Sequence, residues 1–183
     1  MGMSNCIDTI KKVINSDYLS KSQEYLIEED VKARKVTIYC PKNIEYVLYK
    51  FDEKNLPKDK QKIFPFFNRD IPGLNKMADY MLFAEKNKKL SVFLIELKCS
   101  SCSKQQLDAM ELYAQFILKS IERIINIERN KHFIFNLDYK INKIRIKNPK
   151  KIKSKVKIGD PFEINQHGIF DYVWTDFRID TLL

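Results

Sequence analysis

The sequence predicts one α/β domain in which helices flank a central mixed β-sheet. Three observations favour this class: short runs of β-branched and aromatic residues, a strongly apolar hairpin in the middle of the chain, and a long amphipathic stretch directly after it. The chain has 183 residues, 44% of them hydrophobic, which suffices for one core of ordinary size without disulfides or metals. The same composition excludes wholesale disorder, so residues 1–183 are expected to form a single domain.

The N-terminal third is expected to contain two helices followed by two strands. Apolar residues recur at three- to four-residue steps in residues 3–15, and residues 18–32 are interpreted as a second helix. Residues 36–40 and 45–51 are rich in the β-branched and aromatic side chains that are typical of strands. A Pro-Lys-Asn sequence between these two runs predicts a hairpin turn.

The middle of the chain gives the strongest local signal. Residues 78–84 and 90–98 are apolar runs separated by a charged turn, so they predict a β-hairpin whose second strand is central in the sheet. Residues 103–129 repeat apolar side chains at helical spacing and predict a long amphipathic helix. Residues 133–137 are expected to form a strand parallel to the one before the helix, because a right-handed crossover would connect the two.

Basic residues concentrate after this crossover. The formal net charge is +9, and residues 139–159 carry nine Lys and Arg and no acidic residue. Alternating basic and apolar residues in 143–147 and 152–158 predict a β-hairpin with its Lys side chains on one face, and a disordered basic linker is the alternative. Such a surface favours nucleic acid as a partner. The residues expected to contact its phosphate backbone are Lys143, Arg145, Lys147, Lys150, Lys151, Lys153, Lys155 and Lys157.

The sequence also predicts a compartment. It contains no apolar run of the length that a membrane-spanning helix needs, and its first twenty residues do not resemble a secretory signal. The expectation is a cytoplasmic protein without a membrane partner. Cys99 and Cys102 form a C-x-x-C pair that lacks further zinc ligands at suitable spacing, and a thiol-based redox or regulatory function at this pair is one alternative.

Charged residues interrupt the apolar strands of the central hairpin. Asp79 lies in the first strand, and Glu96 and Lys98 end the second, where the alternation of side chains places both on one face. Burying these charges is costly unless they are paired or hold a cation. The two carboxylates and the main-chain carbonyl of Leu97 form an oxygen site suited to Mg²⁺ or Mn²⁺, and Lys98 would orient or activate water for attack on a phosphodiester. The alternative is an ion pair between Asp79 and Lys98 with a solvated Glu96.

These residues resemble a known family. Asp79, followed seventeen positions later by a Glu-Leu-Lys sequence, is similar to the signature of the PD-(D/E)XK nucleases. The resemblance implies a restriction-endonuclease-like αβββαβ core over about residues 18–137, with a basic and aromatic extension over about residues 138–183. It further implies a nuclease that depends on Mg²⁺ or Mn²⁺ and cuts DNA, with RNA as the alternative substrate, and it leaves a homodimer open.

The resemblance also implicates residues outside the signature. A polar residue early in the crossover helix often approaches the site in this family, and Gln105 and Gln106 stand at that place. A further acid from the preceding helix would complete the metal ligands. Glu28 is the candidate for that acid, with Glu24 and Glu45 as alternatives. The alternative function is a protein that keeps this fold with a degenerate site and binds nucleic acid or forms complexes without catalysis.

Overall fold

A six-stranded mixed sheet lies at the centre of the computed structural model, which describes residues 6–28, 34–51, 77–97, 103–129, 136–146, 163–172 and 176–183. The strand order is β3-β4-β5-β6-β8-β7. Neighbours are antiparallel from β3 to β5, parallel from β5 through β6 to β8, and antiparallel between β8 and β7. The strands are β3 Glu45–Lys50, β4 Tyr80–Lys86, β5 Lys89–Glu96, β6 Tyr139–Ile146, β7 Glu163–Ile164 and β8 Ile169–Tyr172.

The central hairpin of β4 and β5 confirms the sequence prediction. Its register pairs Tyr80 with Ile95, and its two-residue loop consists of Asn87 and Lys88. These loop residues have φ angles of 52° and 65°, as a type I′ turn requires. Every residue of β5 after Lys89 is buried, because the strand is covered on both faces.

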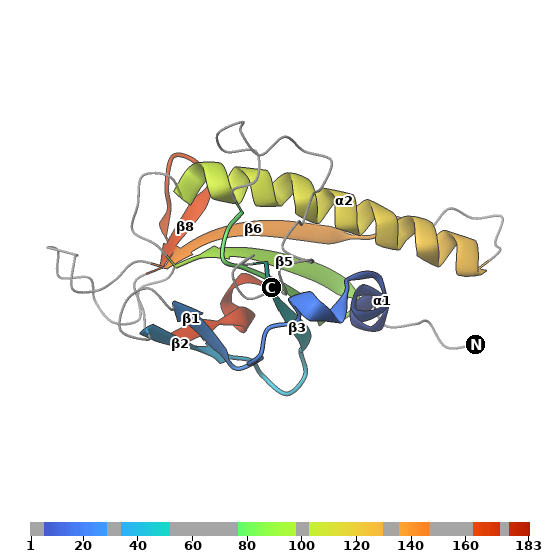
Figure 1. Ribbon diagram of the computed structural model, residues 1–183, viewed down its shortest axis with the longest axis horizontal. Helices are drawn as coiled ribbons and strands as arrows, with labels where there is room; N and C mark the ends of the chain where they lie inside the picture. The colour runs from blue at the N-terminus through green and yellow to red at the C-terminus, as the bar shows by residue number, and fades with distance from the viewer. Residues whose placement is uncertain are drawn as a thin grey trace, which may run out of the picture.

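Two helices cover one face of this sheet. Helix α1 spans Cys6–Val13, and α2 spans Ser103–Arg129, as the helical spacing predicted. Figure 1 shows α2 lying along β5 and β6, with β1 and β2 on the other side. The buried line of α2 packs on alternate residues of β5, and these contacts form the first hydrophobic core. Its members include Leu107, Met110, Ala114 and Leu118 of α2 and Val92 and Leu94 of β5.

A three-stranded sheet covers the opposite face. It has the order β1-β2-β9 and consists of β1 Tyr25–Glu28, β2 Arg34–Tyr39 and β9 Asp176–Arg178. Leu26 and Phe177 are completely buried in the second hydrophobic core, against residues of β4 and β5 such as Phe93. Short 3-10 helices at Ser16–Tyr18 and Ile179–Leu182 flank this sheet in sequence. The burial of Phe177 shows that β9, near the C-terminus, packs on the rest of the domain.

Two N-terminal predictions are wrong. A helix was expected at 18–32, but its described part, residues 18–28, forms no α-helix: residues 25–28 form β1, where Leu26 points inward and Ile27 outward with the period of a strand. The strands expected at 36–40 and 45–51 exist, but β2 and β3 belong to different sheets and do not pair as a hairpin. The turn between them, with Ile44 N donating to Pro41 O at 3.1 Å, carries the chain from one sheet to the other.

The crossover strand was also placed wrongly. The strand parallel to β5 is β6, at residues 139–146, and it takes up the segment expected to be the first arm of a basic hairpin. β6 cannot be a hairpin arm there, because β5 and β8 pair with its two edges. Residues 133–135 and the expected second arm, 152–158, lie outside the described residues. So do Lys147, Lys150, Lys151, Lys153, Lys155 and Lys157.

Neither described helix has the length and apolar character required to cross a membrane.

Candidate active site

The two carboxylates predicted from the central hairpin face each other across it. Asp79 precedes the registered pair of Tyr80 and Ile95 by one position, so it stands opposite Glu96. Both share the strand parity of residues packed under α2, such as Met81 on β4 and Leu94 on β5. The backbone N–H of Leu97 donates to Asp79 Oδ2 at 2.8 Å. The fold therefore brings Asp79 and Glu96 together, as the sequence predicted, and it places them on the α2 face.

Their burial differs in a way that constrains the chemistry. Glu96 is 0% exposed, whereas Asp79 is half-buried. A carboxylate in such a place must be compensated by cations or hydrogen bonds, since desolvation penalises its charged form. The alternative interpretation is therefore wrong in leaving Glu96 solvated, while its ion pair between Asp79 and Lys98 is not tested. Lys98 itself lies outside the described residues, so its expected part in catalysis stays a prediction.

A second pair of charged residues lies beside Asp79 and Glu96 on the next two strands of the sheet. The parallel register aligns Glu96 with Arg145 on β6, and Arg145 in turn with Asp171 on β8. Arg145 donates from Nε to Asp171 Oδ1 at 2.7 Å and from Nη2 to Asp171 Oδ2 at 2.8 Å. The sequence reasoning missed Asp171, although it interrupts the apolar run Ile169-Phe170 in the way that Asp79 interrupts β4. It also placed Arg145 among the nucleic-acid contacts, whereas its guanidinium is held within the fold.

Lys143 forms a second polar link, between β6 and α2. Its Nζ lies 2.7 Å from Asp108 Oδ1 and 2.7 Å from Glu111 Oε2. Burial alone would lower the pKa of Lys143, but the hydrogen bonds to the two acids outweigh it and hold that pKa above its usual value. Lys143 is thus engaged beneath α2 and does not lie on an exposed basic face, which corrects its expected contact with nucleic acid.

The two glutamines at the start of α2 separate in role. Gln106 Nε2 donates to the backbone carbonyl of Met77 at 3.0 Å, which ties the first turns of α2 to the chain just before Asp79. Gln105 is exposed on the same helix. Gln106 therefore fits the expected position beside the site, and Gln105 does not contribute a described contact there.

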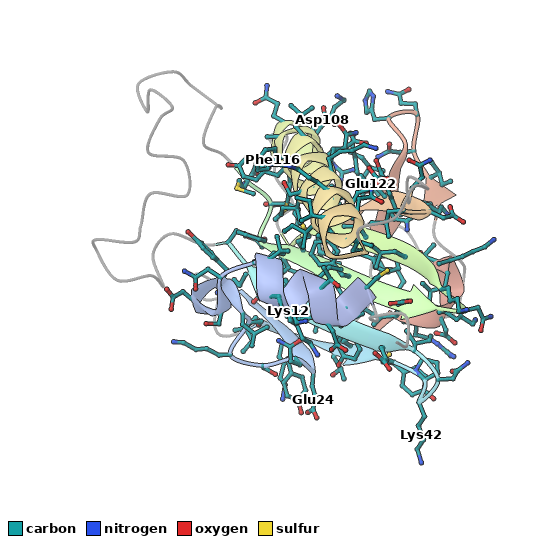
Figure 2. All side chains as sticks on the ribbon, turned by 90° about the vertical axis from the view of Figure 1, so that its right-hand side faces the viewer. Lys12, Glu24, Lys42, Asp108, Phe116 and Glu122 are labelled. Atoms are coloured by element: carbon teal, nitrogen blue, oxygen red, sulfur yellow. The ribbon has the colours of Figure 1, made fainter. Side chains whose placement is uncertain are left out.

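The three acids proposed to complete the site do not join it by the expected route. The helix that was to carry Glu24 and Glu28 is a strand of the small sheet, which covers the opposite face of the main sheet. Figure 2 shows Glu24 on the far side of the molecule from Asp108 of α2. Glu45 pairs in register with Glu85, at the end of β4 remote from Asp79. The side chain of Glu28 is outside the described part.

Glu24 instead lines an open groove on the small sheet, with a volume of about 430 Å³. The groove also includes Tyr25, Tyr39, Cys40 and Tyr46. Burial raises the pKa of the Cys40 thiol to about 11, with the Asp180 charge as a second cause. Because the groove and the carboxylate pair lie on opposite sides of the main sheet, they are separate features.

The carboxylate oxygens of Asp79 and Glu96 are of the type that binds a hard divalent cation. Two opposed carboxylates supply oxygen ligands of the type that Mg²⁺ and Mn²⁺ prefer, and such ions keep several waters. Among the residues that the structure describes, no group of three His, Cys, Asp or Glu side chains comes together as a complete metal centre. The pair would therefore depend on water, substrate or other residues for its remaining ligands.

No protein-family model matches this chain, and comparisons with curated proteins and with solved structures gave no significant match.

Proposed function

We propose that the protein is a metal-dependent nuclease that hydrolyses phosphodiester bonds of DNA. The observation that carries this proposal is the direct opposition of Asp79 and Glu96 on the α2 face, where the central hairpin meets the start of the crossover helix. Two carboxylates held opposite each other repel when both are charged, and a divalent cation between them would offset this repulsion.

The order of the elements supports the same proposal. Helix α1 comes first, and after the small-sheet strands β1 and β2 the chain continues through the antiparallel strands β3, β4 and β5, helix α2 and the parallel strand β6. With β1 and β2 set aside, this order supports a restriction-endonuclease-like αβββαβ core, in which Asp79 lies just before the second strand and Glu96 ends the third. The core proposed here spans residues 6–146, somewhat displaced from the 18–137 expected from the sequence.

The residues divide into separate tasks. Asp79 and Glu96 would hold Mg²⁺ or Mn²⁺, which supplies Lewis-acid polarisation of a phosphate oxygen and a more acidic bound water. The Leu97 amide fixes one oxygen of Asp79, and so orients that carboxylate before any ligand arrives. Lys98 would hold or deprotonate the attacking water, and Gln106 keeps α2 in place above Asp79 through Met77.

Substrate binding falls to the basic residues after β6. Lys143 and Arg145 are held in ion pairs, so they do not serve as phosphate contacts. We infer that Lys147, Lys150, Lys151, Lys153, Lys155 and Lys157 attract the backbone without reading its sequence.

Cleavage assays test the proposal. Labelled single- and double-stranded DNA and RNA are incubated with the full chain in Mg²⁺, Mn²⁺ or excess chelator. The wild type is expected to cleave DNA only with metal, and Asp79→Asn and Glu96→Gln are expected to lower the rate about 100-fold or more. Asp138→Asn, which changes an exposed acid beyond the opposite end of β6, is the matched control and should cleave like the wild type.

One observation favours a second function, non-catalytic nucleic-acid binding with a degenerate site. Glu96 is completely buried, and no third acid joins the pair among the described residues. This protein would bind DNA in a manner that weakens steeply with salt, independently of metal, and would cleave no substrate. Tight binding without cleavage on any substrate would replace the nuclease proposal by this one.

A further inference from the structure

Four charged residues form one row across neighbouring strands of the main sheet. Asp79 on β4 stands opposite Glu96 on β5, Glu96 aligns with Arg145 on β6, and Arg145 aligns with Asp171 on β8. Neighbouring strands lie about 4.8 Å apart, so each residue is adjacent to the next. The row contains three carboxylates and one guanidinium. Arg145 is thus flanked on its two sides by Glu96 and Asp171.

Arg145 makes a bidentate contact with Asp171. Nε and Nη2 donate to the two oxygens of Asp171 at 2.7 and 2.8 Å, the parallel geometry in which a guanidinium and a carboxylate bind best. The two side chains are 20% and 19% exposed. This partial shielding from water makes the pair stronger than an ion pair on the open surface.

The position of the guanidinium matters for any cation at Glu96. A positive charge one strand away competes for the carboxylate of Glu96 and repels a divalent ion bound there. The bidentate contact with Asp171 directs two hydrogen bonds of Arg145 toward β8. The carboxylate of Asp171 also offsets the charge of the guanidinium that the cation would meet.

We propose that Asp171 is a positioning residue that holds Arg145 toward β8 and thereby keeps Glu96 available to a divalent cation. This inference rests on the proposed function, because it assumes a cation at Asp79 and Glu96. It makes Arg145 the competitor of the cation and Asp171 the residue that restrains this competitor. Loss of the restraint and loss of the competitor should therefore change cation affinity in opposite directions.

Calorimetric titration of Mn²⁺ into the full chain, without nucleic acid, separates these effects. Asp171→Asn is expected to weaken Mn²⁺ binding about tenfold, because Arg145 then turns its hydrogen bonds to Glu96. Arg145→Gln is expected to tighten binding several-fold, and the double variant should bind like Arg145→Gln, since Asp171 acts only through Arg145. Asp171→Glu, which keeps the carboxylate, should restore most of the affinity.

The matched control is a second arginine–aspartate pair, remote from the site. Arg178 donates from Nε and Nη2 to the two oxygens of Asp180 at 3.3 and 3.1 Å, at the small sheet. Asp180→Asn removes the same kind of contact and should leave Mn²⁺ affinity unchanged. Thermal unfolding of each apo protein shows that it is folded. If Asp171→Asn fails to fold, Arg145→Gln alone decides, because only competition predicts tighter binding.

The outcomes distinguish the inference from the function on which it rests. A wild type that binds no Mn²⁺ overturns the cation site and the inference with it. A wild type that binds Mn²⁺ and cleaves DNA, with affinity that is unchanged or weakened in Arg145→Gln, overturns the inference and leaves the nuclease standing. Opposite shifts in Asp171→Asn and Arg145→Gln support it.

Discussion

Replacing Lys143 by methionine tests whether a shielded ammonium anchors α2 above the carboxylate pair. Lys143 is 17% exposed and bonds to Asp108 and Glu111, whose side chains are 39% and 34% exposed. A charge-assisted hydrogen bond contributes about 1.5–3 kcal/mol when well shielded. Water reaches both acids and rehydrates them after the substitution, so the free energy of unfolding should fall by about 1–2 kcal/mol in total. For a chain of this length that lowers Tm by roughly 2–8 °C.

Urea unfolding followed by far-UV circular dichroism at pH 7 measures this loss. The control is Lys104→Met, because Lys104 pairs with the same Asp108 but is 47% exposed. This i,i+4 surface pair should contribute less than about 0.5 kcal/mol. Equal losses in the two variants, or no loss in Lys143→Met, would refute the reasoning that shielding under α2 makes the Lys143 contact the stronger one.

The same variant has a defined pH dependence. Burial tends to raise the pKa of Asp108, but hydrogen bonds from Lys104 and Lys143 outweigh it and hold that pKa below its usual 3.8. Since the folded pKa lies below the unfolded one, the pair stabilises the protein above about pH 4. That contribution disappears as the pH falls through the lowered folded pKa. The stability difference between wild type and Lys143→Met should therefore narrow below about pH 4.

Two substitutions and one measurement of thiol reactivity test the packing around the sheets. Glu122→Leu removes the carboxylate that accepts from the backbone N–H of Leu137 at 2.8 Å, and it should lower the free energy of unfolding by about 1–3 kcal/mol in urea titrations. Tyr80→Phe removes a hydroxyl that bonds to both N and O of Ile27 at 2.9 Å, and it should cost about 1–2 kcal/mol by the same measurement. The Cys40 thiol, with its pKa raised to about 11, should react with iodoacetamide more slowly than a free thiol at pH 8 and accelerate up to about pH 11.

Each of these three experiments has a control that distinguishes its stated cause from a general loss of packing. Glu122→Gln keeps an oxygen acceptor and should lose less stability than Glu122→Leu. Tyr46→Phe removes a hydroxyl that makes one hydrogen bond, to Gln23 O at 2.9 Å, and should cost less than Tyr80→Phe. Unfolding in urea should abolish the slow reaction of Cys40, and a thiol that is equally slow when unfolded would contradict burial as the cause.

The elements that the sequence predicted well depend on neighbours close in the chain. The central hairpin pairs residues across a two-residue turn. Apolar residues at helical spacing over 27 residues predict α2. Segment 18–32 was misjudged because β1 has only four residues, and its strand form depends on pairing with β2. The turn at Pro41 was recognised, but whether it joins two paired strands or two sheets depends on distant partners.

The site residues show the same difference: those set by local sequence could be predicted, and those set by distant partners could not. Asp79 and Glu96 could be found because a charge in an apolar strand is conspicuous, and the hairpin register follows from the turn. Lys143 and Arg145 were interpreted as a solvated basic face, because their alternation with Ile144 and Ile146 is the same for a half-exposed strand and for a buried one with acidic partners. Asp171 was missed because parallel pairing with β6 leaves no local mark in sequence.

The pairing of β9 with β2 has a consequence for how the chain reaches this fold. Thr37 and Asp176 are partners about 140 residues apart. Bringing them together therefore costs the conformational entropy of closing a very long loop. The hairpin of β4 and β5 and the helix α2 should form early in folding, and the small sheet should form last. Until β9 arrives, Leu26, Val36 and Ile38 lack the cover of Phe177. Aggregation during expression should therefore begin at the N-terminal strands, and substitutions that weaken β9 should lower the yield of soluble protein.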